Sequence, residues 1–268
     1  MDRALSRRYL HAMGVQAWRP RDAETRVEDG AEQLAQPEPE GRVEMPGGTV
    51  PSDCGAAPAT SVPVAEPFPG DAVASLDWGP LQQAVAACRA CELCRTRTQT
   101  VFGVGDRNAD LMIIGEAPGA DEDRQGEPFV GRAGQLLNLM LAAIGLKREQ
   151  VYIANVLKCR PPGNRDPRSE EALRCEPFLM RQIALIRPRV LLSVGRISAQ
   201  KLLKTDTPIG KLRGRWFEFG PDGTPLIVTY HPAYLLRSPD QKAKAWHDLI
   251  QIMRRLRSAQ EDVGNRVG

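Results

Sequence analysis

Four cysteines form two groups that lie far apart in the sequence and have the spacing of metal ligands. The first group is Cys88 and Cys91, with two residues between them, and the second is Cys159 and Cys175. A single Cys-x-x-Cys is weak evidence, but two groups in basic loops with Gly and Pro are stronger. Four converging thiolates can hold an iron–sulfur cluster or a tetrahedral zinc ion. Cys91 and Cys94 form a competing Cys-x-x-Cys pair.

A loop rich in carboxylates lies between the two cysteine groups. Residues 115–119 read Gly-Glu-Ala-Pro-Gly, so that Glu116 is followed closely by Asp121, Glu122 and Asp123. A phosphate-binding loop has no use for four carboxylates, which disfavours a nucleotide P-loop. Carboxylates here can orient a water molecule or hydrogen-bond a neutral ligand. A solvated acidic turn is the alternative for the two aspartates.

A second loop combines an amide with basic side chains. Asn155 follows a short apolar run, and its side chain can present a donor and an acceptor to the edge of an amide-like base. A turn-forming role explains Asn155 equally well. The segment that follows carries four cations that fit phosphate contacts: Lys158, Arg160, Arg165 and Arg168.

A third loop contains the one histidine predicted to lie at a sheet edge, His231. Leu235 and Leu236 follow it. Leucines at a loop tip are unfavourable unless they insert into something, and either a wedge between DNA bases or packing beneath the loop accounts for them. Phe129, in the first loop, fits either the core or a stacking surface.

The segments around these loops predict an α/β fold. Short apolar runs alternate with helical periodicity, which favours a mainly parallel sheet between helices. The predicted strands are 111–114, 151–154, 190–194, 215–219 and 226–230, and the predicted helices are 81–91, 133–144, 169–187, 197–204 and 241–257. Ligands of such sheets bind at the carboxyl ends of the strands. The loops 115–131, 155–168 and 231–237 all lie there.

Composition divides the chain into three parts. Residues 1–19 have the spacing of a short amphipathic helix, residues 20–78 form a Pro-, Ala-, Glu- and Gly-rich linker predicted to be disordered, and residues 79–260 form the folded domain. Residues 1–80 contain seven Lys or Arg and thirteen Asp or Glu, whereas the rest contains 29 and 20. A basic domain behind an acidic tail suits a polyanionic partner.

The apolar content favours a globular protein with one hydrophobic core over a membrane protein. The 268 residues are 42% hydrophobic, enough for one core, and no apolar run approaches the ~18 residues of a membrane span. We see no secretory signal and expect a cytoplasmic protein, in which cysteines are reduced, metal-bound or inert rather than paired in disulfides.

Taken together, four ordered motifs and the four cysteines resemble the family 4 uracil-DNA glycosylases, the iron–sulfur members of that superfamily. The resemblance covers about residues 81–257. The motifs are Gly-Glu-Ala-Pro-Gly-Ala-Asp-Glu-Asp from 115, Gly-Glu-Pro-Phe-Val-Gly-Arg-Ala-Gly from 126, Asn-Val-Leu-Lys-Cys-Arg-Pro-Pro-Gly-Asn from 155 and His-Pro-Ala-Tyr-Leu-Leu-Arg from 231.

The resemblance implies a fold, a cofactor and a reaction. The fold is a central four-stranded, mainly parallel sheet between helices. A [4Fe–4S] cluster is ligated by Cys88, Cys91, Cys159 and Cys175, and pins a loop that touches DNA. The enzyme flips deoxyuridine out of single- or double-stranded DNA and hydrolyses its N-glycosidic bond, as a monomer in the bacterial cytoplasm near the nucleoid. A shifted specificity, for hypoxanthine or mismatched thymine, and a non-catalytic DNA-binding module remain alternatives.

Roles for individual residues follow from the resemblance as well. Phe129 stacks on uracil, Asn155 reads its N3–H and O4, and His231 stabilises the departing uracil anion. Leu235 or Leu236 fills the gap in the stack, beside Arg237. Crowding near Gly119 and Glu122 excludes thymine.

The residue that orients the attacking water is left open. In related families it lies in the first motif, at the position that is Ala117 here. The remaining choices are Glu116, Glu122 and Asn164. The segment 158–168 has no inserted basic loop ending in His, so we expect turnover rather than covalent trapping of DNA.

A weaker resemblance concerns the N-terminus. Residues 3–18 resemble the N-terminal peptide of the psi subunit of the bacterial clamp loader, which docks on the loader collar through a short helix and a Trp, here Trp18. The resemblance implies a repair enzyme tethered to the replisome.

Overall fold

The structure, a computed structural model, describes His11, Gly14 and residues 70–264. The rest of the predicted N-terminal helix and of the predicted linker lies outside the described residues. No helix within the described part of the chain is both long and apolar enough to cross a membrane.

A six-stranded sheet forms the centre of the domain, in the order β1-β3-β2-β4-β6-β5. The four central strands are parallel to their neighbours, and the two edge strands are antiparallel. Every residue of β2 and β4 is buried, as expected of parallel strands covered on both faces. The strands are β1 (Val104–Gly105), β2 (Leu111–Gly115), β3 (Tyr152–Asn155), β4 (Val190–Val194), β5 (Trp216–Phe219) and β6 (Thr224–Thr229).

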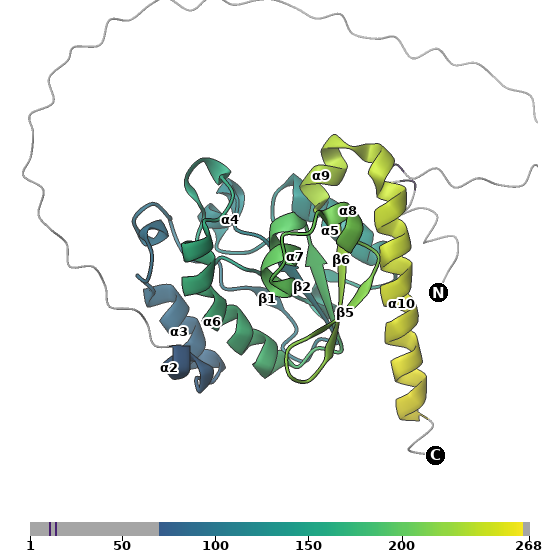
Figure 1. Cartoon of the computed structure of the whole chain (residues 1–268), viewed down its shortest axis with the longest axis horizontal. Helices are drawn as coiled ribbons and strands as arrows, with labels where there is room; N and C mark the ends of the chain where they lie inside the picture. Colours follow the sequence, from purple (N-terminus) through teal and green to yellow (C-terminus); the bar gives the residue numbers. More distant parts are fainter. Residues whose placement is uncertain (1–10, 12–13, 15–69, 265–268) are drawn as a thin grey trace, which may run out of the picture. The chain divides into compact units, whose positions relative to one another are not determined.

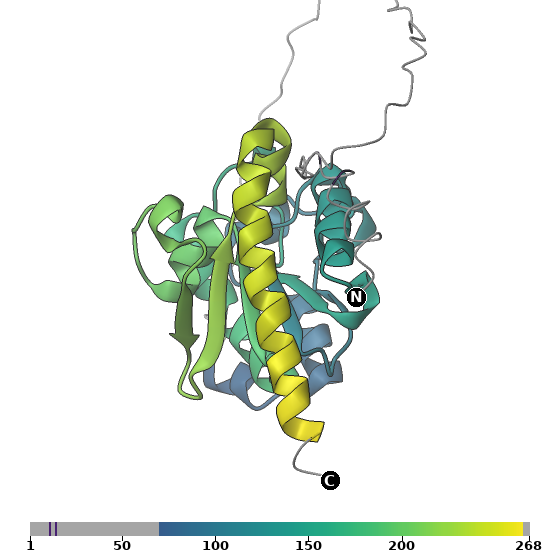
Figure 2. The same cartoon turned by 90° about the vertical axis from the view of Figure 1, so that its right-hand side faces the viewer.

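Helices cover both faces of the sheet (Figures 1 and 2). Along β2, Met112 and Ile114 face the core beneath one helix layer, whereas Leu111 and Ile113 face the other. The first layer contains α2 (Gly70–Ala74), α3 (Trp78–Ala87), α6 (Ser169–Ile186), α7 (Arg196–Leu203) and α8 (Ile209–Leu212). The second contains α5 (Arg132–Ala143), α9 (Pro232–Arg237) and α10 (Lys242–Gly264). The predicted four-stranded parallel core with flanking helices is therefore confirmed.

Short helices complete the connections between these elements. The α4 helix (Ala120–Gln125) follows β2, and four 3-10 turns are η1 (Glu92–Arg95), η2 (Arg148–Gln150), η3 (Pro162–Asn164) and η4 (Pro239–Gln241).

The folded domain begins earlier than residue 79, which corrects the predicted boundary. Val73 is buried, and Leu76 packs against the same core. The Trp78 ring meets Phe102 and Tyr152 edge to face, with centroids 5.4 Å apart in both pairs. Residues 70–78 therefore belong to the domain, because their apolar side chains supply part of its core.

Candidate active site

The register of the sheet brings the first two predicted loops together. Gly115 ends β2 opposite Asn155, which ends β3. A Cβ atom added to Gly115 would clash with the Asn155 side-chain oxygen and would lie 2.7 Å from the Phe129 ring. Glycine is therefore required at residue 115, because the amide and the aromatic ring close over the backbone there. The sequence prediction that Asn155 and Phe129 share one site is consistent with this geometry.

Asn155 holds an unusual acceptor. The residue is only 2% exposed, and its Oδ1 is the one buried side-chain nitrogen or oxygen atom in the described part of the chain that has no hydrogen-bond partner. Leaving a buried acceptor unpaired costs about 1–3 kcal/mol. Such an atom points to a ligand that supplies the missing donor.

Phe129 is held in a strained conformation by its surroundings. Its φ of 55° is uncommon for a bulky side chain. Arg148 donates to the carbonyl oxygens of Pro128 at 2.5 Å and of Phe129 at 3.3 Å. Gly134 packs so tightly on the Phe129 carbonyl that no Cβ fits there. These contacts fix the ring, and Arg148 is a residue of the site that was not predicted from the sequence.

His231 lies parallel to Phe129, with ring centroids 5.5 Å apart and an interplanar angle of 29°. Its Nδ1 accepts a hydrogen bond from the Ala233 N–H at 3.1 Å and thereby caps α9. The proton of the neutral ring is therefore on Nε2, which is left as a donor. The pKa of His231 is lowered to about 4, mainly by burial and also by the nearby Arg237, while Glu122 opposes the shift.

Glu122 is used by the loop itself. One carboxylate oxygen accepts from the Gly119 N–H at 3.1 Å, and the other from the Val130 and Gly131 N–H groups at 3.0 and 3.2 Å. A Cβ on Gly119 would lie 2.7 Å from this carboxylate. Glu122 thus connects the two ends of the Phe129 loop, and its oxygens face main-chain donors rather than an open space for water.

The neighbouring aspartates also have structural partners. The buried Asp123 carboxylate accepts from the Thr98 N–H with both oxygens, at 3.0 and 3.1 Å, and Asp121 forms an ion pair with Arg124 at 2.5 Å. Asp123 therefore stabilises the fold, and Asp121 matches the solvated alternative.

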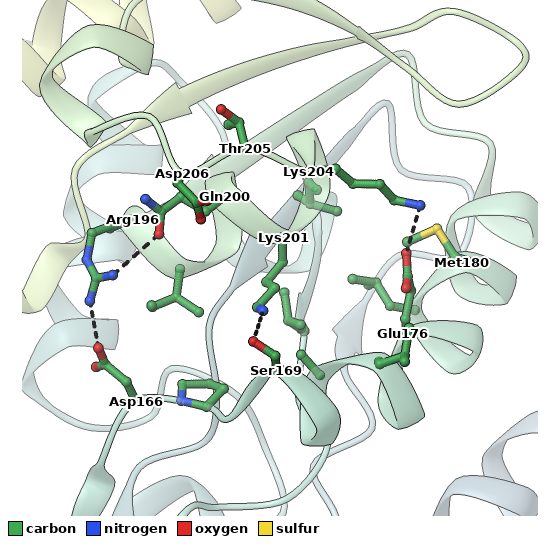
Figure 3. A pocket seen from close by; sticks show the side chains of 17 residues that line it. Asp166, Ser169, Glu176, Met180, Arg196, Gln200, Lys201, Lys204, Thr205 and Asp206 are labelled. Carbon is green, nitrogen blue, oxygen red and sulfur yellow. Dashed lines mark hydrogen bonds and ion pairs between the residues drawn. The ribbon is translucent and has the colours of Figure 1, made fainter. Parts of the chain in front are cut away.

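Glu116 belongs to a separate charge environment. The pKa of Glu116 is raised to about 7, mainly by burial and also by the nearby Asp166, while Arg196 opposes the shift. Asp166 and Arg196 form an ion pair at 2.6 Å on the rim of a groove of about 660 Å³ between α6 and α7 (Figure 3). Val156, directly after Asn155, also lines this groove. Ala117 is part-buried and packs against the core.

Two arginines of the loop after β3 form hydrogen bonds with nearby side chains. Arg165 forms a paired hydrogen bond with the buried Glu171 at 2.5 and 2.9 Å, and Arg160 donates to the exposed Asn164 at 2.7 Å. Lys158 is 1% exposed, which corrects the prediction that it contacts DNA phosphate, because a buried ammonium group cannot reach the backbone of DNA. Arg160 and Arg165 are only partly buried, so part of each residue stays exposed to solvent.

The segment 231–237 was expected to be a loop and is instead the α9 helix capped by His231. Leu235 is 1% exposed and packs into the core, so the prediction that it inserts into DNA is wrong. Leu236 and Tyr234 are 36% and 37% exposed, and Arg237 is exposed beside them. A helix turns successive side chains by about 100°, which separates the two leucines.

The cysteines of the predicted metal site come from four different parts of the chain and lie around one cavity. Cys88 ends α3, Cys91 precedes η1, Cys159 follows β3, and Cys175 lies in α6. These four and Cys94 line one small cavity. Burial raises the pKa of Cys159 to about 11 and that of Cys175 to about 12.

One guanidinium group and one main-chain N–H donate hydrogen bonds to these sulfur atoms. Arg97 donates to Cys159 Sγ at 2.9 Å, and the main-chain N–H of Lys158 donates to Cys175 Sγ at 3.2 Å. In the described part of the chain, no three His, Cys, Asp or Glu side chains are arranged around a point that would suit a single metal ion. Arg97 could not be predicted as part of this cluster, because an arginine between two loops carries no sequence signal of its partner.

Comparisons with known proteins assign the family. Residues 102–250 match the family model described as the uracil DNA glycosylase superfamily. The chain is 46% identical over 174 residues to a type-4 uracil-DNA glycosylase of Archaeoglobus fulgidus, covering 63% of this chain and 87% of the relative. It is 42% identical to a type-4 enzyme of Thermotoga maritima, covering 59% and 82%.

A type-5 uracil-DNA glycosylase of Pyrobaculum aerophilum is more distant, at 34% identity over 49% of this chain and 64% of the relative. The higher identity and the wider coverage both favour the type-4 enzymes. The chain belongs to the type-4 uracil-DNA glycosylases.

Proposed function

We propose that this chain excises uracil from DNA by hydrolysing the N-glycosidic bond of deoxyuridine, leaving an abasic site. Asn155 Oδ1 carries the proposal, because it is a buried, unpartnered acceptor in a slot bounded by Phe129 and near His231. The reaction acts on a base inside the DNA stack, so the nucleotide must first be flipped out at a cost of roughly a few kcal/mol.

Recognition of the flipped base uses the amide of Asn155. Its Oδ1 accepts from the uracil N3–H, and its NH₂ group donates to O4. Cytosine presents an acceptor at N3 and a donor at its amine, so the same amide opposes it. Phe129 stacks on the base, while Gly119 and Glu122 restrict the space for a methyl group.

Catalysis depends on the charge that develops on the leaving base. As the bond to the sugar breaks, negative charge grows on uracil O2, and a fixed donor stabilises it most in the transition state. His231 supplies Nε2–H as that donor. Because its pKa is lowered to about 4, the ring is neutral at physiological pH, and its hydrogen bond to Ala233 preserves this tautomer.

Glu116 is our choice for the group that orients the attacking water. Both Glu122 oxygens accept from the main chain, and Asn164 is exposed and accepts from Arg160. Glu116 follows Gly115 directly in the chain, is part-buried, and has a pKa raised to about 7. A carboxylate with that pKa can accept a proton from water at neutral pH.

An oligonucleotide assay tests the proposed function and the Glu116 assignment together. We expect wild-type protein to release uracil from a strand with one deoxyuridine, and to release little base from matched strands with thymine, cytosine or hypoxanthine. The single-turnover rate should rise with pH through about 7, because only the ionised carboxylate accepts a proton. Glu116→Gln should lower the rate and remove this limb, whereas Asp166→Asn should keep it but shift it to lower pH.

The outcomes of this assay separate the alternatives. Faster release of hypoxanthine or thymine than of uracil indicates a shifted specificity. Binding without release of any base indicates a DNA-binding module and contradicts the proposal. A pH limb that persists in Glu116→Gln assigns the water to another group.

DNA contacts are proposed for the exposed side chains of the same edge. Leu236 replaces Leu235 as the side chain that fills the vacated gap, with Tyr234 beside it. Arg237 ends α9, Arg160 and Arg165 lie in the loop after β3, and these three residues are proposed to supply cations for phosphate. These contacts are independent of base pairing, so single- and double-stranded DNA are both proposed as substrates.

A [4Fe–4S] cluster is the proposed occupant of the cysteine cavity. Cys88, Cys91, Cys159 and Cys175 would hold it, and the donors from Arg97 and Lys158 to two of the sulfur atoms match the hydrogen bonding that tunes such clusters. A cluster spreads its ligands over four iron atoms, so the thiolates need not converge on one point. Bound there, it would supply a structural link between the end of α3 and the loop after β3.

The cluster assignment makes a prediction about colour. Protein purified with its cluster should be brown, with a broad absorbance near ~400 nm. Serine at Cys88, Cys91, Cys159 or Cys175 should abolish this absorbance and lower solubility. Cys94→Ser is the matched control, because Cys94 lines the same cavity and should retain the colour. Colourless protein with stoichiometric zinc would contradict the assignment.

Three expectations stay predictions. They are docking of residues 3–18 on the clamp-loader collar, a monomeric state, and a cytoplasmic, nucleoid-associated location.

A further inference from the structure

Lys158 is a fully buried lysine that lies between the cysteine cavity and Asn155. Its Nζ donates to the main-chain oxygen of Asn155 at 3.0 Å and to Gln182 Oε1 at 2.6 Å. Its main-chain N–H donates to Cys175 Sγ, and its carbonyl accepts from Val101 N–H at 2.8 Å. Burying an ammonium group costs several kcal/mol, so its retention needs a reason.

Gln182 fixes the direction of this lysine. It is 0% exposed and lies two helical turns after Cys175, on the same side of α6. Its NH₂ group donates to the Phe102 carbonyl at 2.9 Å and to the Tyr152 hydroxyl at 3.3 Å. Rotating the amide would place NH₂ against the ammonium group and oxygen against a carbonyl. Gln182 therefore has one orientation, with its oxygen toward Lys158.

The main chain directly after Asn155 is held by the end of β2 and the loop that follows it. Val156 N–H donates to the Gly115 carbonyl, and Leu157 N–H donates to the Glu116 carbonyl, both at 3.0 Å. Lys158 adds the bond to the Asn155 carbonyl from the cysteine side. The peptide that carries the amide is thus fixed by both the base slot and the cysteine cavity, and a misplacement of about 1 Å in a catalytic site can cost about 10²-fold in rate.

We propose that Lys158 is a positioning residue for uracil recognition, which ties the main chain of Asn155 to the cysteine cavity through its buried ammonium group. The proposal rests on the function assigned to Asn155 above. Lys158 does not touch the base: it acts through Asn155, and Gln182 orients it. Loss of the lysine should therefore matter only while Asn155 reads the base.

A double-mutant cycle tests this dependence. Lys158→Met keeps the length of the side chain and removes its donors. We expect it to retain the absorbance near ~400 nm that the wild type shows and to slow single-turnover excision of uracil by at least about tenfold. In an Asn155→Ala background the same change should cost less than about twofold, because the residue through which it acts is already lost. Equal losses in the two backgrounds, or an unchanged rate in Lys158→Met alone, would overturn the proposal.

Two further variants guard against failure of the first. Gln182→Met removes the partner of Lys158 and should show the same dependence on Asn155, with a smaller loss. Arg97→Met is the matched control: Arg97 also contacts the cysteine cavity, through Cys159 and Cys88, and its effect on the rate should be the same in both backgrounds. If Lys158→Met and Gln182→Met both lose the absorbance, the two residues serve cluster assembly and the proposal fails. A wild type without uracil release, or an Asn155→Ala variant with the wild-type rate, would instead refute the function on which it rests.

Discussion

Replacing His231 by alanine should slow single-turnover excision of uracil by about 10²–10³-fold, the usual cost of removing one donor to a developing anion. The Nε2–H of His231 faces a charge that exists mainly in the transition state, so affinity for DNA should change far less than the rate. Single-turnover kinetics give the rate, and fluorescence anisotropy on DNA with an abasic site gives the affinity.

His231 has a second role, which the control must separate. Its Nδ1 caps α9 through the Ala233 N–H, so alanine removes the cap as well as the donor. Asparagine is a good N-cap residue. We therefore expect His231→Asn to restore thermal stability but not the rate. If His231→Asn excises uracil at the wild-type rate, or if His231→Ala does so, the histidine is structural and another group stabilises the uracil anion.

The acidity of His231 adds a pH test to the same variants. Because its pKa is lowered to about 4, the imidazole stays neutral from about pH 5 upward, and the wild-type rate should show no limb from this residue there. Protonation below about pH 4 competes with the hydrogen bond from Ala233 and should loosen α9.

The fold could be predicted from the sequence where one physical signal dominates. The strands 111–114 and 190–194 are continuous apolar runs because both faces of a parallel strand are buried, and the structure has β2 and β4 there. Short helices without a clear apolar face were missed. The α2 helix reads Gly-Asp-Ala-Val-Ala and follows a Pro-rich stretch, so that only tertiary packing of Val73 reveals that it belongs to the domain.

The site could be predicted in part, for a related reason. Asn155 and His231 were identified because each follows an apolar strand, and strand ends meet at one edge of the sheet. The direction of a side chain is not available from such a pattern. Lys158 looks like its neighbour Arg160 in the sequence, yet it points inward to Gln182, while Leu235 and Leu236 differ only by one helical step. Arg148 was missed because its partners are main-chain carbonyls.

Replacing Asn155 by aspartate should lower excision of uracil by more than about tenfold and create a low rate on cytosine. An ionised carboxylate cannot donate to uracil O4, and it would face that oxygen with lone pairs. Burial at this position disfavours the charged form and raises the pKa of the new carboxyl group. The ionised fraction therefore loses uracil, whereas the protonated fraction has one donor and one acceptor and can turn to donate to cytosine N3 and accept from the exocyclic amine, the reverse of the pattern that asparagine presents.

The comparison variant for this prediction is Asn155→Ala, which removes both the donor and the acceptor. It should lose uracil excision without gaining cytosine excision, because alanine offers no hydrogen bond to either base. The gain on cytosine should also be larger at low pH, where more of the introduced carboxyl group in Asn155→Asp is protonated. Release of uracil and cytosine from matched single-stranded oligonucleotides measures both rates. If Asn155→Asp keeps wild-type activity on uracil, Asn155 does not read O4, and its unpartnered Oδ1 must serve a different ligand.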